Sequence, residues 1–377
     1  MRFLARERST IDNLLPGLDQ ALAGHPLLDL ERPGTPGIQE FRTAGGPGLL
    51  VPTRHKGVGA TAVEAVRVQR AIGARSPSLA VATTMHHFSM ASLVVLSETG
   101  DGLEWMLMEG IATTGQLLAS GFAEGRSGAG ILQPTMTAEV EPAGVRISGV
   151  KRPCSLAHSM DLLTASVRVP RLDGGGEQLA VALIPADSKG LHVSPFWGSF
   201  VLAGAESDQI TLDGVLVPED LVVRTETPVG KALDELQTAG FVWFELLMGA
   251  SYLGAASALV ERVLRRPAVP AADRVALVAT LEAAMGGLEN VARQVPEHQA
   301  EEELLAECLF ARYAAQDAIA RTVPRAVELL GGMAFVVGDD VGYLAAAVHG
   351  LGFHPPSRPR AAEDLANYLE DGPLVIH

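Results

Sequence analysis

The sequence has little cysteine: Cys154 and Cys308 are the only two in 377 residues. They lie far apart and in no metal-ligand spacing, so neither a disulfide framework nor a zinc site can organise this chain. We therefore expect no metal. A chain that needs no disulfides fits a reducing compartment, and the sequence predicts a cytoplasmic protein.

Basic charge and long apolar runs are also scarce. The chain has 29 Lys and Arg against 44 Asp and Glu, a net charge of −15, which argues against nucleic acid as a partner. No window reaches the roughly 18 uninterrupted apolar residues of a membrane span, so we expect no membrane partner. Aromatic residues make up 5% of a chain that is 47% hydrophobic, which indicates helices packed through Ala, Leu and Val, or an oligomer that hides apolar faces.

Hydrophobic periodicity divides the chain into three expected domains. Over residues 1–120 the period is helical, with Ser9 or Thr10 as expected caps and Gly24 as an expected stop. Ser76 and Pro77 separate an amphipathic helix from a nearly all-apolar one, which must be buried. The N-terminal domain is therefore predicted to be all-helical.

The period changes to two over residues 121–226, where short strands are punctuated by Gly, Pro and Asp. The segments "EPAG" at 141–144 and "DGGG" at 173–176 are predicted hairpin turns, and the whole predicts a β-sandwich or small barrel. Over residues 227–377 the helical period returns and predicts a four-helix bundle. Small residues including Gly249 and Gly254 should let another helix approach closely.

The segment "GLGFHPPSRP" at 350–359 stands before the last predicted helix. Two consecutive prolines cannot lie inside a helix, because each lacks the N–H donor and its ring clashes with the preceding turn. His354 is therefore expected on an irregular, well-anchored segment.

Several stretches in this order resemble the acyl-CoA dehydrogenase superfamily, and the resemblance covers nearly the whole chain. They are "PTRHKGVGATAVEAVRVQRAIG", "GFAEGRSGAG", "GVKRPCSLAHSMDLLTASV", "LDGVLVPEDLVV" and "ELLGGMAFVVGDDVGYL". The resemblance implies an α+β multidomain fold that clamps FAD, with FMN as the alternative, between the β domain and the helical bundle. It also implies a homodimer or homotetramer whose neighbouring subunit contacts the cofactor.

The same resemblance implies flavin-binding positions. "GVKRPCS" places Cys154 and Ser155 at the flavin ring; the alternative for Ser155 is a hairpin-end hydroxyl. The remaining implied positions are Glu124, Ser127 and Gly128 in "AEGRSGAG", and Gly331 and Gly332 in "ELLGG".

Two motifs depart from the family at its cofactor pyrophosphate. "RxxFG" has become "RRPAVP", which leaves Arg265 and Arg266 as substitutes. "QxxGG" has become "ELLGG", so Glu328 stands where an acid would repel a pyrophosphate. For Glu124 in "AEGRSGAG", the alternative is an acidic residue of a turn that has no role in cofactor binding.

The usual catalytic Glu of the family is missing, because its position falls on Pro355. His354 precedes it, and Glu245 lies one residue beyond the position of the family's alternative base. Both are candidate catalytic groups; the alternatives are a loop imidazole for His354 and a salt bridge at the bundle surface or a subunit interface for Glu245. His86 and His87 are candidate substrate-pocket residues, one facing the pocket and one packed, or both packed.

Three functions remain open. The first is a flavin-dependent oxidoreductase that introduces an α,β double bond into an acyl thioester of coenzyme A or a carrier protein, passing electrons to an acceptor. The second is a monooxygenase of the same fold that receives reduced flavin from a partner reductase; several such enzymes carry "LHD" where this chain has "FHP". The third is a redox-silent homologue that binds an acyl group or carrier protein.

Overall fold

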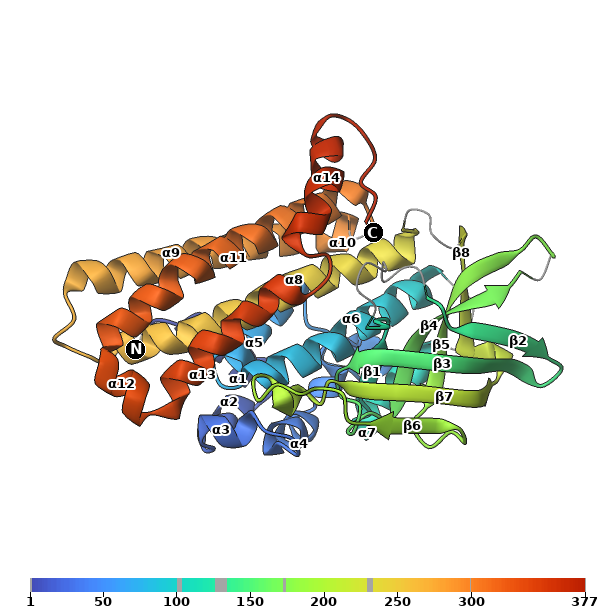
Figure 1. The fold of residues 1–377 in the computed structure, drawn as a ribbon, viewed down its shortest axis with the longest axis horizontal. Helices are drawn as coiled ribbons and strands as arrows, with labels where there is room; N and C mark the ends of the chain where they lie inside the picture. The colour runs from blue at the N-terminus through green and yellow to red at the C-terminus, as the bar shows by residue number, and fades with distance from the viewer. Residues whose placement is uncertain are drawn as a thin grey trace. The chain divides into compact units, whose positions relative to one another are not determined.

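A computed structural model describes residues 2–99, 104–125, 134–171, 174–228, 233–298 and 300–376. Helical, then β, then helical segments follow one another, as the resemblance to acyl-CoA dehydrogenases implied (Figure 1). By compactness the chain forms two units. Unit 1 contains residues 1–115, 199–205 and 238–354, and unit 2 contains residues 116–198, 206–237 and 355–377. The three expected domain boundaries stay a prediction.

The helices have the following bounds: α1 Ala5–Leu14, α2 Leu18–Ala23, α3 Leu27–Leu30, α4 Pro36–Thr43, α5 Ala62–Gly73, α6 Pro77–Thr99, α7 Glu104–Thr114, α8 Glu235–Leu264, α9 Ala271–Ala292, α10 Val295–His298, α11 Glu302–Leu330, α12 Gly332–Val337, α13 Asp339–Ala347 and α14 Arg358–Leu369. A short 3-10 helix, η5, spans Val348–Phe353. The long helices α8, α9 and α11 run alongside one another in unit 1 (Figure 1).

Local sequence explains where some of these helices begin. Thr61 and Glu64 form a capping box at the start of α5, and Ser76 and Pro77 separate α5 from α6 as predicted. The expected caps Ser9 and Thr10 were wrong, because both lie inside α1, where the Thr10 hydroxyl donates to the carbonyl of Arg6. Gly24 does end α2, as predicted.

Helix α8 is a long, apolar helix buried inside unit 1. By length and composition α6 (Pro77–Glu98), α8 and α9 could each cross a membrane, but the most apolar window of α8 is 100% buried inside the protein. A Cβ atom at Gly254 would lie 2.3 Å from the backbone oxygen of Arg70, so only glycine permits the close crossing of α5 and α8. The close approach predicted at this small residue is confirmed.

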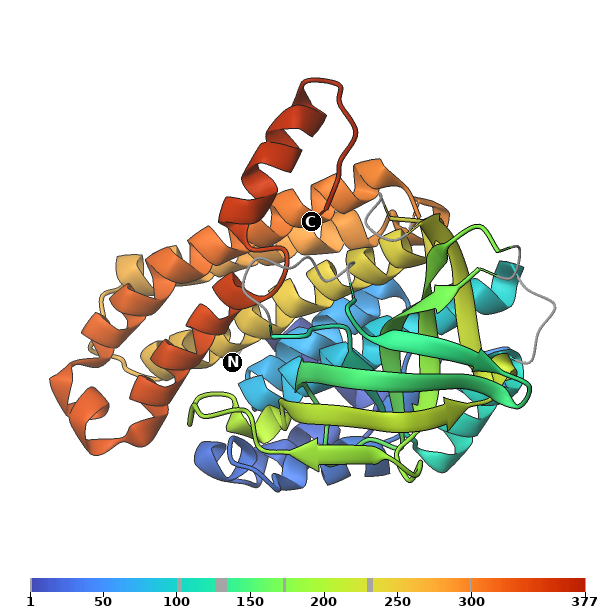
Figure 2. The ribbon, with the colours of Figure 1, turned by 45° about the vertical axis from the view of Figure 1, so that its right-hand side comes forward.

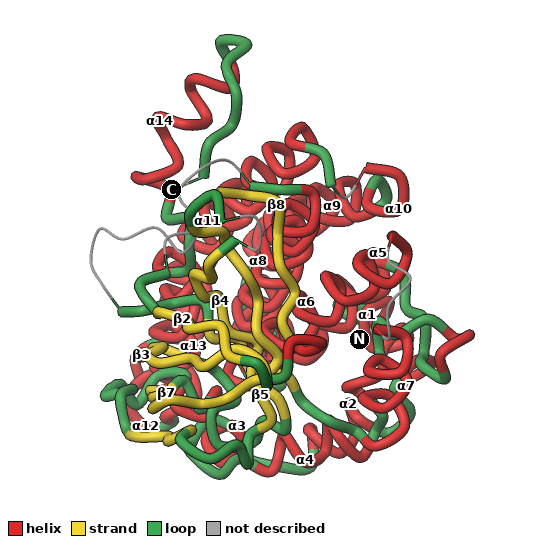
Figure 3. Tube along the Cα trace, turned by 90° about the vertical axis from the view of Figure 1, so that its right-hand side faces the viewer, coloured by secondary structure: helices red, strands yellow, loops and turns green. Residues whose placement is uncertain are grey.

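Unit 2 is built on one eight-stranded sheet with the order β6-β7-β3-β2-β4-β5-β8, and β1 pairs with β4 (Figures 2 and 3). The strands are β1 Leu118–Gly121, β2 Thr137–Glu141, β3 Gly144–Cys154, β4 Leu162–Pro170, β5 Glu177–Pro185, β6 Leu191–Ser194, β7 Asp208–Val217 and β8 Val222–Pro228. The turn predicted at 141–144 joins β2 to β3, and the described residues 174–176 of the second predicted turn lie between β4 and β5.

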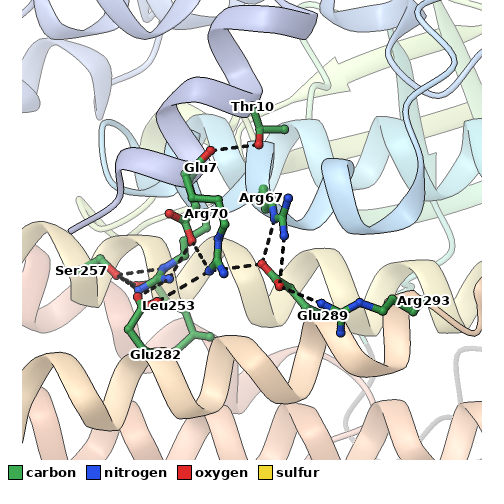
Figure 4. A network of polar contacts seen from close by, with 10 residues as sticks. Glu7, Thr10, Arg67, Arg70, Leu253, Ser257, Glu282, Glu289 and Arg293 are labelled. Carbon is green, nitrogen blue, oxygen red and sulfur yellow. Dashed lines mark hydrogen bonds and ion pairs between the residues drawn. The ribbon is translucent and has the colours of Figure 1, made fainter. Parts of the chain in front are cut away.

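A buried ion-pair network ties α1, α5, α8 and α9 together (Figure 4). The Arg70 side chain is 0% exposed; its guanidinium lies 2.9 Å from Glu7 and 2.7 Å from Glu282, and it donates to the hydroxyl of Ser257. Nearby, Arg67 and Arg293 both pair with Glu289. A buried charge with several partners is costly to leave unpaired, so this network depends on its fully buried members.

We therefore expect Arg70→Met to lower the free energy of unfolding by about 3 kcal/mol, because Glu7 loses its buried partner. Arg293→Ala is the matched control: that guanidinium is 56% exposed, and its loss should cost less than about 1 kcal/mol. Urea denaturation followed by circular dichroism measures both. Equal losses for the two variants would contradict a special role for the buried arginine.

Candidate active site

His354 lies on the segment between η5 and α14, with an extended backbone of φ −69° and ψ 138°. Its backbone is anchored as expected: the Arg312 guanidinium donates to the carbonyls of Leu351 and His354, at 2.9 and 2.6 Å. The imidazole is half-buried, and its Nε2 lies 2.9 Å from the hydroxyl oxygen of Tyr252. In the described part of the chain Nδ1 has no hydrogen-bond partner, and this nitrogen is not fully enclosed by the protein.

Arg312 is held in turn by Glu245. The two side chains are both 0% exposed, and Arg312 Nη1 lies 2.6 Å from Glu245 Oε2. The ion pair is buried within unit 1, not at the bundle surface or a subunit interface as the alternative for Glu245 supposed. Burial raises the pKa of Glu245 to about 7, and the charge of Arg312 offsets only part of that effect.

The aromatic rings of Phe244 and Tyr252 lie beside the imidazole. The centroid of the Phe244 ring is 6.1 Å from that of His354. The ring centroids of Phe88 and Phe241 lie 5.7 and 6.4 Å from that of Phe244. Burial, followed by the positive charge of Arg312, lowers the pKa of His354 to about 3. The imidazole is therefore neutral at neutral pH.

His86 and His87 lie side by side on α6, and both are 0% exposed. His86 Nε2 is 2.9 Å from the carbonyl of Pro47, whereas neither ring nitrogen of His87 has a partner in the ranges described. Burial and the neighbouring His86 lower the pKa of His87 well below its usual value. Neither ring reaches solvent, and their role in a substrate pocket stays a prediction.

In unit 2, Ser155 follows the last residue of β3 and its hydroxyl lies 3.0 Å from that of Ser207. Two non-glycine residues with left-handed backbone adjoin this pair, Leu156 at φ 64° and Glu206 at φ 54°. Such conformations cost free energy and cluster at functional sites. Glu206 is 7% exposed, and its Oε2 is enclosed without a hydrogen-bond partner among the described residues.

Two other predicted cofactor positions in unit 2 have structural partners. Cys154 is buried at the end of β3, and burial raises the pKa of its thiol to about 12, so it is not a reactive thiolate. The Glu124 carboxylate accepts hydrogen bonds from Thr135 and from the buried Lys151, which hold its pKa below the usual range despite partial burial. Ser127 and Gly128 lie outside the described residues.

Gly331 and Gly332 join α11 to α12, and Gly331 has φ 77°. A Cβ atom on either would meet nothing within 4 Å, so space is open beside both. Arg266 donates to the carbonyl of Leu330, which places it at this junction. The Glu328 carboxylate lies 2.7 Å from Arg325, so its charge is partly compensated.

The sequence did not identify Tyr252, Arg312, Ser207 or Glu206 as site residues. A signal existed for Tyr252, because it follows Glu245 by seven residues and therefore lies on the same face of α8. Arg312 was inaccessible to sequence reasoning, since its partners come from α8, from η5 and from the segment after η5. Glu206 carries no local signal for a left-handed backbone in a non-glycine residue.

Comparison with known proteins places this arrangement in context. No protein-family model matches the chain. The chain is 47% identical over 379 residues to isobutylamine N-hydroxylase of Streptomyces viridifaciens, and the match covers 100% of both proteins.

Solved structures share the fold. The FMN-bound TdsC of Paenibacillus sp. A11-2 has a TM-score of 0.80 at 18% identity, covering 100% of this chain and 99% of that one. A nitrososynthase of Micromonospora carbonacea var. africana has a TM-score of 0.80 at 20% identity, covering 97% of each chain. The identity to isobutylamine N-hydroxylase supports the monooxygenase alternative better than dehydrogenation of an acyl thioester. The chain belongs to the same family as isobutylamine N-hydroxylase, on an acyl-CoA dehydrogenase-like fold.

Proposed function

We propose that the protein is a flavin-dependent N-hydroxylase of a small aliphatic primary amine. The reaction consumes the amine, dioxygen and reduced flavin, and yields the hydroxylamine, water and oxidised flavin. The observation that carries the proposal is the neutral imidazole of His354, in a chain 47% identical to an amine N-hydroxylase, beside the position where dehydrogenases hold a carboxylate base.

His354 fits oxygen chemistry better than proton abstraction from carbon. With a pKa of about 3, it is a weak base near pH 7 and would not take the α proton of an acyl thioester. A neutral imidazole with one accessible nitrogen can instead donate a hydrogen bond to a reacting oxygen. Its anchoring through Arg312 holds the ring in place for this role.

Glu245 is the other candidate for a base. Its pKa of about 7 would suit proton transfer, but Oε2 is committed to Arg312, and replacing that contact would leave a buried charge without a partner. We propose that Glu245 positions Arg312 and so the His354 segment.

A bound reduced flavin would supply the electrons and activate dioxygen. Unit 2 offers groups that fit a flavin: the paired hydroxyls of Ser155 and Ser207, and the enclosed Glu206 Oε2, an acceptor that a ring N–H or ribityl hydroxyl would satisfy. We propose that a separate reductase supplies the flavin, as FMN or FAD.

The surroundings of His354 favour an apolar amine. Phe244 lies beside the imidazole and packs against Phe88 and Phe241, and the Glu245 carboxylate is paired with Arg312. Because an apolar environment disfavours charge, it favours the neutral amine, which is the nucleophilic form. The substrate that we propose is a primary amine with a branched alkyl chain, such as isobutylamine.

We also propose a homodimer or homotetramer in the cytoplasm. Helix α12 exposes an apolar surface that a second copy would cover. Its members and their exposed fractions are Met333 (73%), Phe335 (52%), Val336 (77%) and Val337 (74%).

We expect His354→Gln to lower the rate of amine N-hydroxylation on the order of 100-fold, because the glutamine amide takes the place of Nε2 and leaves no donor at the place of Nδ1. The assay follows hydroxylamine formation from isobutylamine under air, with reduced FMN and reduced FAD in parallel. His298→Gln, at a half-exposed position on α10, is the control and should keep full activity. Full activity in the His354 variant would contradict the assignment, and oxidation of an acyl thioester without oxygen would contradict the reaction.

Glu245→Gln separates a positioning role from a base. The amide still accepts a hydrogen bond from Arg312, so we expect less than about a 10-fold loss of turnover, measured below the melting temperature. We expect a loss of about 3 kcal/mol in unfolding free energy, because the Arg312 charge is left buried without a counter-charge. A loss of 100-fold or more with unchanged stability would identify Glu245 as the base instead.

A further inference from the structure

The hydroxyl of Tyr252 contacts the imidazole of His354 from within unit 1. Tyr252 is 1% exposed on α8, its hydroxyl oxygen lies 2.9 Å from Nε2, and the two ring centroids are 5.6 Å apart. This short contact involves the candidate catalytic side chain itself, whereas Arg312 donates a hydrogen bond to its backbone carbonyl.

Two hydrogen-bond directions are possible for this contact. If Nε2–H donated to the phenol oxygen, the phenol hydrogen would need another acceptor, and His354 is the one partner of this hydroxyl among the described residues. A buried hydroxyl hydrogen without an acceptor is costly, because the group has lost its hydrogen bonds to water. Burial also raises the pKa of Tyr252 above its ordinary value, so the phenol keeps its proton. Both groups are satisfied only when Tyr252 O–H donates to Nε2.

The direction of this bond decides which nitrogen carries hydrogen. A neutral imidazole whose Nε2 accepts must hold its hydrogen on Nδ1. Nδ1 is the nitrogen that is not enclosed and has no protein partner in the described ranges. The Nδ1–H tautomer, the less common one in free histidine, would thus present an N–H donor to a ligand. The more common Nε2–H tautomer would present the lone pair of Nδ1 there.

We infer that Tyr252 is a positioning residue that fixes His354 as the Nδ1–H tautomer, so that Nδ1 donates to the oxygen that reacts with the amine. The catalytic consequence rests on the proposed N-hydroxylase function, but the tautomer is a property of the protein alone. Arg312 and Tyr252 then act on different parts of His354: Arg312 holds its backbone and Tyr252 selects the hydrogen position of its ring.

Nitrogen-15 NMR of the full chain labelled at histidine tests the tautomer without substrate or flavin, with the His354 signals identified by their loss in His354→Gln. Near pH 7 we expect Nε2 to resonate as an acceptor nitrogen and Nδ1 as an N–H nitrogen. Tyr252→Phe should shift His354 towards the Nε2–H tautomer. An Nε2–H signal in the unmodified protein would overturn the inference, whether or not the variant folds.

Tyr343→Phe is the matched control, because it removes another buried hydroxyl, one that contacts Glu31 and the backbone N–H of Leu202. It should lower stability and leave the His354 tautomer unchanged. A tautomer change in this control equal to that of Tyr252→Phe would make the effect one of general destabilisation and overturn the inference.

Turnover links the tautomer to catalysis. We expect Tyr252→Phe to lower kcat roughly 10-fold with little change in KM for the amine, because binding does not need the Nδ1 hydrogen. Unchanged kcat alongside a changed tautomer would overturn the positioning role. Inactivity of the unmodified protein towards amines, with the Nδ1–H tautomer observed, would reject the proposed function and keep the tautomer assignment.

Discussion

The buried ion pair between Glu245 and Arg312 is the interaction on which the candidate site depends. Both side chains are fully enclosed, and the pair joins α8 to α11 and, through two carbonyl contacts, to the segment that carries His354. A buried pair of this kind adds little net stability over apolar packing, but losing one partner is severe. Its value here is that it holds an irregular segment in one conformation.

The same pair explains the chemistry of the imidazole. The positive charge of Arg312 adds to burial in disfavouring a second proton on His354, while Glu245 balances that charge so that it can remain inside. Tyr252 and Phe244 complete the surroundings from α8. A site whose imidazole is neutral and whose Glu245 carboxylate is paired with Arg312 is poorly suited to abstract a proton from carbon. It is well suited to hydrogen-bond oxygen, which agrees with the 47% identity to an amine N-hydroxylase.

Much of the fold followed from the sequence, because periodicity reports which faces are buried. The break at Ser76 and Pro77, the hairpin at 141–144 and the close approach at Gly254 were all predictable from turn chemistry and residue size. The caps of α1 were not, because Ser9 and Thr10 precede an apolar run but the helix begins earlier, at Ala5.

Sequence reasoning reached part of the site. His354 stood out because Pro355 occupies the place of the usual base, but its state depends on Arg312 and Tyr252, which are 42 and 102 residues away along the chain. Glu245 also stood out in the sequence, as an acid within an apolar helix. That pattern is the same for a residue that transfers protons and for one that pairs with a buried cation. Only its partner distinguishes the two.

The most direct test of the account is the origin of the product's oxygen. The protein is supplied with isobutylamine, reduced flavin and oxygen-18 gas, and the product is analysed by mass spectrometry. The account predicts a hydroxylamine that carries one oxygen atom from the gas. An unlabelled product, or flavin reduction by an acyl thioester in the absence of oxygen, would contradict it.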